Sequence, residues 1–74
     1  MNELTLVIND NFGDNYIFVT VFDNDHNQIT VDTTEARNFI NSSTEVQRSG
    51  FVIGGILWVP DKCVYRVVYD RIAN

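Results

Sequence analysis

The sequence predicts a small α+β fold, in which one helix packs on one face of an antiparallel sheet of about five strands in the order βββ-α-ββ. In several short stretches apolar residues alternate with polar ones, which is the period of a strand, and one later stretch repeats them at the period of a helix. Short polar turns separate the first stretches, and such short connections favour antiparallel pairing. With only 74 residues, the chain is expected to form a single domain over residues 1–74.

Three strands are predicted in the first half of the chain, at residues 3–9, 16–22 and 29–32. The first places Leu4, Leu6 and Ile8 on one face. The second is apolar or aromatic at every position except Thr20, which is typical of a central strand. Two polar segments, at residues 10–15 and 23–28, are predicted to be the turns between them.

One helix is predicted after the third strand. Residues at positions i, i+3, i+4 and i+7 fall on a single face of this helix, namely Ala36, Phe39, Ile40 and Ser43. Asp32 is expected to cap the helix, because Glu35 follows three residues later and completes a capping box.

Two more strands are predicted in the second half, at residues 51–59 and 63–69. Gly54 and Gly55 lie in the middle of the first of these, where two glycines permit either a tight hairpin or a bulge in one strand. The bulge is favoured because Pro60 and Asp61 provide a turn immediately after the strand.

The charge is acidic and unevenly distributed along the chain. The net charge is −5, and residues 1–36 carry −7 without one lysine or arginine, whereas the rest of the chain carries +2. Binding to nucleic-acid backbones requires clustered basic residues, so direct nucleic-acid binding is not expected. No apolar run approaches the roughly 20 residues that span a bilayer, and no basic leader opens the chain. With one cysteine and no secretion signal, a cytoplasmic location away from membranes is expected.

Several residues that could support chemistry are better explained structurally. Asp23, Asp25 and Asn27 match three ligand positions of a calcium-binding loop, but the glycine and the final glutamate of such a loop are absent, so a polar turn is favoured. His26 is the only histidine and Cys63 the only cysteine, and nothing in the sequence places a base beside that thiol. No catalytic residue, metal site or cofactor is therefore predicted, and the chain is not expected to be an enzyme.

Two surfaces are predicted to make interactions instead. The first is a set of carboxylates in the acidic half of the chain, which could imitate the phosphates of a nucleic acid if they converge: Asp10, Asp14, Asp23, Asp25 and Asp32. The second is the aromatic side of the second strand, formed by Tyr16, Phe18 and Phe22. The competing interpretations are that the carboxylates only keep the chain soluble, and that polar side chains and the termini cover the aromatic side.

In size and composition, with its acidic and asparagine-rich sequence, the chain resembles the small stand-alone proteins common in bacteriophages. That resemblance implies a stoichiometric inhibitor or adaptor of a larger host protein, such as one that processes nucleic acids, and it assigns no individual residue. The first hypothesis is therefore a non-catalytic protein-binding module that uses the acidic or the aromatic surface. The alternative is a self-associating structural or assembly subunit, including a homodimer formed through the aromatic face.

Overall fold

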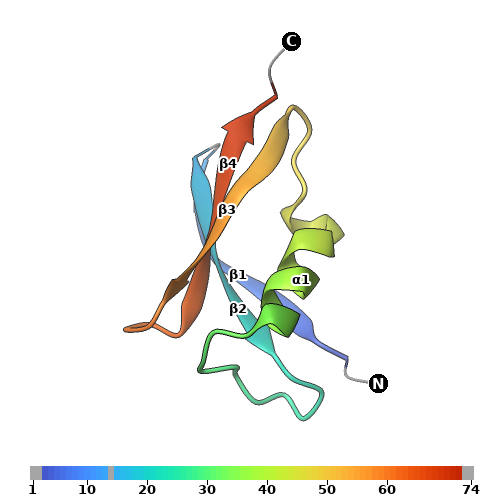
Figure 1. Ribbon diagram of the computed structural model, residues 1–74, viewed down its shortest axis with the longest axis vertical. Helices are drawn as coiled ribbons and strands as arrows, with labels where there is room; N and C mark the ends of the chain where they lie inside the picture. Colours follow the sequence, from blue (N-terminus) through green and yellow to red (C-terminus); the bar gives the residue numbers. More distant parts are fainter. Residues whose placement is uncertain (1–2, 14, 73–74) are drawn as a thin grey trace.

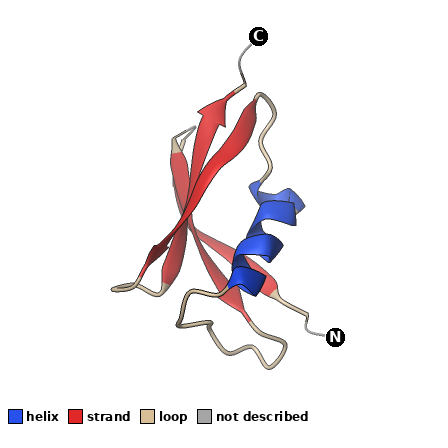
Figure 2. Cartoon of the chain, viewed as in Figure 1, coloured by secondary structure: helices blue, strands red, loops and turns tan. Residues whose placement is uncertain are grey.

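Four antiparallel strands, one α-helix and a short 3₁₀ turn form the fold over residues 3–13 and 15–72, which the computed structural model describes. In chain order the elements are β1 (Thr5–Phe12), β2 (Tyr16–Phe22), α1 (Thr34–Ser42), η1 (Thr44–Val46), β3 (Phe51–Val59) and β4 (Val64–Arg71). The predicted α+β class is confirmed (Figures 1 and 2). No described helix is long and apolar enough to cross a membrane.

The sheet has the strand order β1-β2-β4-β3 and consists of two hairpins. β1 pairs with β2, β3 pairs with β4, and the two hairpins join where β2 pairs with β4. β2 is therefore a central strand, as its apolar sequence predicts, and β1 and β3 are the edges. The sheet is strongly twisted, and α1 lies beside one of its faces (Figure 1).

The third predicted strand, at residues 29–32, is wrong. This segment contributes one isolated bridge between Phe22 and Gln28 and one hydrogen bond in which the Ile29 N–H donates to the Val21 carbonyl at 2.9 Å. The physical reason is that β4 pairs with β2 from Tyr16 to Val19, so the position beside β2 is occupied by a strand that comes much later in the sequence. The described part of the sheet thus has four strands rather than five.

The glycine pair in β3 forms a bulge, as the sequence favours. The register against β4 shifts between Ile53 and Gly55, so Gly54 is the extra residue. A Cβ at Gly54 would collide with the Asp70 carboxylate, so a larger residue there would require that side chain to move. The strand then continues to Val59 without reversing.

The helix buries the face predicted for it, but its cap differs. Ala36 and Ile40 are fully buried, and Phe39 is half-buried beside them. The N-cap is Thr33, whose Oγ1 accepts a hydrogen bond from the Ala36 N–H at 3.0 Å. Asp32, the predicted cap, instead pairs with Arg37.

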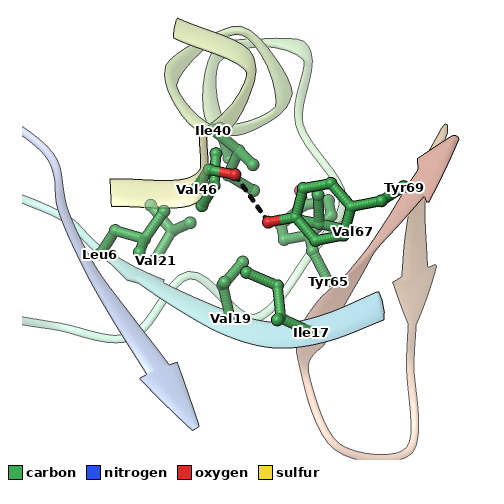
Figure 3. Close-up of a cluster of buried hydrophobic side chains, with 10 residues drawn as sticks. Leu6, Ile17, Val19, Val21, Ile40, Val46, Tyr65, Val67 and Tyr69 are labelled. Atoms are coloured by element: carbon green, nitrogen blue, oxygen red, sulfur yellow. Dashed lines mark hydrogen bonds between the residues drawn. The ribbon is translucent and has the colours of Figure 1, made fainter. Parts of the chain in front are cut away.

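One hydrophobic core lies between the sheet and the helical segment (Figure 3). Its buried members come from alternate positions of the strands and from α1 and η1: Leu6, Ile17, Val19, Val21, Ala36, Ile40, Val46, Tyr65, Val67 and Tyr69. The Tyr69 hydroxyl donates a 2.6 Å hydrogen bond to the Val46 carbonyl, which fastens η1 to β4 (Figure 3). All of these residues lie on the face of the sheet that α1 covers. No described helix packs on the opposite face (Figure 2).

Candidate protein-binding surface

The strands alternate between a covered face and a face that we call the outer face. On β2, Ile17, Val19 and Val21 are at most 1% exposed, whereas Tyr16, Phe18 and Phe22 point to the other side and are half-buried. The strand registers extend the outer face to all four strands, and its residues are Thr5, Val7, Asp10, Phe12, Tyr16, Phe18, Thr20, Phe22, Val52, Gly55, Leu57, Val59, Val64, Arg66, Val68 and Asp70. The outer face is largely apolar, although it contacts neither described helix (Figure 2).

Thr20 and Val64 on the central strands of the outer face are buried, whereas its edge strands expose large apolar side chains. Val7, Phe12, Val52 and Leu57 are between 44% and 52% exposed. They come from both edge strands, so exposed apolar side chains border the half-buried aromatic residues in the middle. Monomeric proteins seldom expose contiguous apolar surface, and such patches commonly mark interfaces.

Three aromatic rings form a cluster on the outer face, and two of them are the predicted Tyr16 and Phe18. The third is Phe12, whose ring stacks on Tyr16 at 4.7 Å and meets Phe18 edge-on at 5.7 Å. Phe12 was missed because the sequence around it is rich in turn formers, whereas β1 extends through it. Phe22 lies outside the cluster, near the far end of β2, where it pairs with Thr5.

Two cations accompany these rings. The Arg66 guanidinium lies 5.1 Å from the Tyr16 ring centre and 5.6 Å from that of Phe18, and Lys62 Nζ lies 5.7 Å from the Phe18 ring. Arg66 is not among the predicted site residues. The sequence does indicate it, because Arg66 is the one charged residue in the apolar stretch from Val64 to Val68 and shares a strand face with those two valines. The aromatic cluster therefore has a positively charged centre.

The predicted acidic residues lie at different places in the fold. Asp10 is in β1, opposite Phe18, rather than in the first turn where it was expected. Asp23 and Asp25 are in the loop after the other end of β2, and Asp14 lies outside the described residues. The Asp23 carboxylate is used locally, since its Oδ1 accepts the backbone N–H groups of Asp25 and Asn27 at 2.9 and 3.0 Å. The structure thus does not bring Asp10 together with Asp23 and Asp25.

Asp32 has a structural partner. Its two oxygens accept 2.8 Å hydrogen bonds from Arg37 Nε and Nη2, and the Tyr65 hydroxyl donates to Oδ1 at 3.0 Å. Arg37 also donates to the Ile56 carbonyl, so this network joins the start of α1 to β3 and β4. The hydrogen bonds from Arg37 hold the pKa of Asp32 below its usual 3.8, against the opposing effect of burial. Burial raises the pKa of Tyr65 above 10.0.

We expect the Asp32–Arg37 pair to make stability depend on acid pH. Because the pKa of Asp32 is lower in the folded state, its contribution is present above the ordinary value of 3.8 and is lost as the pH falls from there through the folded pKa. Thermal unfolding midpoints measured between pH 2 and 6 should therefore fall less steeply with acid in Asp32→Asn than in the wild type. Arg37→Gln should remove the same component, and an unchanged profile in both variants would contradict the assignment.

The other residues that were singled out take part in turns. His26 and Cys63 both have positive φ angles, of 64° and 53°, in the loop after β2 and the turn before β4. The prediction that Cys63 begins the last strand is therefore off by one residue. Its thiol contacts the carbonyls of Thr30 and Pro60 at 3.7 Å. Among the described residues, no group of three histidine, cysteine or acidic side chains is placed to hold a metal ion.

Comparison with known proteins adds no assignment to this surface. The chain matches no protein-family model, no curated protein and no solved structure.

Proposed function

We propose that the chain is a non-catalytic protein-binding module that contacts its partner through the outer face, acting stoichiometrically as an inhibitor, adaptor or assembly subunit. The observation that carries this proposal is the exposed apolar surface around the Phe12–Tyr16–Phe18 cluster. Burying such surface is the main favourable term in protein association, and aromatic residues with arginine are enriched at interfaces.

The composition of the outer face also indicates what kind of partner fits. Arg66 and Lys62 place positive charge against the aromatic rings. A complementary surface would be apolar and would present a carboxylate to this centre. The acidic surface is the weaker candidate, because its described members lie apart and two of them, Asp23 and Asp32, are engaged in contacts within the chain.

Site-specific photo-crosslinking tests this proposal. A benzophenone amino acid in place of Leu57, which is 50% exposed on the outer face, should capture one discrete protein from bacterial lysate. The matched control is the same probe at Val31, which is 63% exposed in the loop after β2. A product from both positions, or from neither, would contradict a binding role for the outer face. Adding Phe18→Ala to the Leu57 probe should reduce the yield of the product.

A further inference from the structure

One row of residues across the outer face contains an acidic residue on β1 and a basic residue on β4, two strands away. The registers place Asp10 of β1 opposite Phe18 of β2, Phe18 opposite Arg66 of β4, and Arg66 opposite Leu57 of β3. Since neighbouring strands are about 4.8 Å apart, Asp10 and Arg66 are separated by roughly 10 Å. This is the distance between their backbones, Phe18 lies between them, and the structure shows no ion pair that joins the two described side chains.

Both charges lack a partner of opposite sign in the part of the chain that the structure describes. The single described ion pair is Asp32–Arg37, so neither Asp10 nor Arg66 takes part in one. The Nε atom of Arg66 is buried and makes no hydrogen bond. A buried guanidinium nitrogen without an acceptor is costly, because water that solvated it has been removed and nothing replaces it.

We infer that a second copy of this chain covers the β1, β2 and β4 part of the outer face, with the two sheets packed face to face about a twofold axis that runs along β2. This inference rests on the proposed function and names its partner. A rotation of 180° about that axis exchanges the positions of β1 and β4. Asp10 of each copy then faces Arg66 of the other, and the two Phe18 rings meet on the axis. The contact is isologous and closes as a dimer.

The next row of the outer face fits the same arrangement. It runs Phe12, Tyr16, Val68 and Gly55 across the four strands. The twofold axis places Phe12 of one copy over Val68 of the other, beside Gly55, where a Cβ would meet nothing within 4 Å. The Phe12 ring on one edge therefore packs on Val68, and the absence of a side chain at Gly55 leaves room beside it. Packed sheets lie about 10 Å apart with strands within roughly 30° of each other, and these side chains fill that space.

The distribution of charge permits this contact despite the net charge of −5. Asp10 is the only carboxylate in the two central rows, whereas Asp23 and Asp25 lie in the loop beyond the end of β2. Because the axis runs along β2, the loops with Asp23 and Asp25 of the two copies lie at the same end of the dimer, beyond the packed strands, where solvent screens their repulsion. A second copy supplies both groups that the outer face needs, a carboxylate (Asp10) opposite Arg66 and an aromatic ring opposite Phe18. A different protein would have to present the same two groups at the same spacing.

A charge-exchange experiment tests the dimer and its register. By sedimentation velocity, the wild type should have twice the 8.5 kDa chain mass at concentrations where Asp10→Arg alone and Arg66→Glu alone sediment as monomers. Each substitution affects two symmetric contacts, so we expect each to raise the dissociation constant by about 100-fold. An equimolar mixture of the two variants should form a heterodimer, because each arginine then faces a carboxylate. Asp25→Arg, which makes the same charge change in a loop, should leave the dimer intact.

The outcomes separate this inference from the proposed function. A wild type that is monomeric at millimolar concentration overturns the dimer, and so does a mixture that remains monomeric although both variants are folded by circular dichroism. If Arg66→Glu does not fold, Asp10→Asn and Arg66→Gln replace the pair, and additive effects in their double variant overturn the contact. Capture of a different protein at Leu57 by a monomeric wild type would leave the proposed function standing without the dimer, whereas a monomeric wild type that captures nothing would remove both.

Discussion

Replacing Ile40 with alanine is expected to lower the free energy of unfolding by about 3 kcal/mol. Ile40 is fully buried where α1 meets the sheet, among Leu6, Val21 and Val46 (Figure 3). Truncation removes apolar contact and leaves a cavity in a core that is too small to close around it. A chain of this size has roughly 4–11 kcal/mol of stability in all, so this variant should be close to its unfolding threshold.

Urea denaturation followed by the fluorescence of Trp58 measures this effect. Trp58 is the only tryptophan, and its ring centre lies 4.8 Å from that of Tyr65 in the core, so its emission should report the loss of packing. Val31→Ala, at a position 63% exposed, is the matched control and should change stability by less than about 0.5 kcal/mol. Equal effects at the two positions would mean that α1 is not docked as described.

The helix and the bulge could be predicted from the sequence because both depend on local patterns. The period of 3.6 residues brings Ala36 and Ile40 to one side of any helix, whatever the rest of the fold. The bulge at Gly54 follows from a glycine pair in an apolar strand with a turn immediately after it. Neither conclusion requires knowledge of which strands are neighbours.

The errors arose where distant segments compete for the same position. Residues 29–32 have the alternation of a strand, yet β4 occupies the free side of β2, a pairing between segments about 50 residues apart in the sequence. The cap of α1 shows the same effect on a smaller scale. Asp32 and Thr33 are both good capping residues, and the choice was decided by Arg37 and Tyr65, which hold Asp32 in a different contact.

The candidate surface was predicted only in its central strand. Tyr16 and Phe18 follow from the alternation of β2, but Phe12 and Arg66 join them through pairings on either side of that strand. The predicted acidic surface depended on convergence, which the sequence does not reveal. Because β1 and β2 form a hairpin, Asp10 is placed toward one end of the sheet and the loop with Asp23 at the other.

Removing the hydroxyl of Tyr69 is expected to cost about 2 kcal/mol of stability, although Tyr69→Phe keeps the ring and its contact with Phe51. The hydroxyl donates to the Val46 carbonyl at 2.6 Å inside the core, and its loss leaves that carbonyl buried without a donor. Tyr16→Phe is the matched control, because the structure shows no hydrogen bond from the Tyr16 hydroxyl to a described residue.

Urea unfolding of both variants, at concentrations low enough for monomers, gives the comparison. The Tyr69 hydroxyl acts at a single point, where η1 follows α1, so its loss should also speed amide hydrogen exchange at residues 44–47 more than in β2. If Tyr69→Phe is as stable as Tyr16→Phe, the bond does not hold η1 against the sheet. If the predicted loss is found, the buried Tyr69 hydroxyl helps to hold η1 on the face of the sheet that α1 covers.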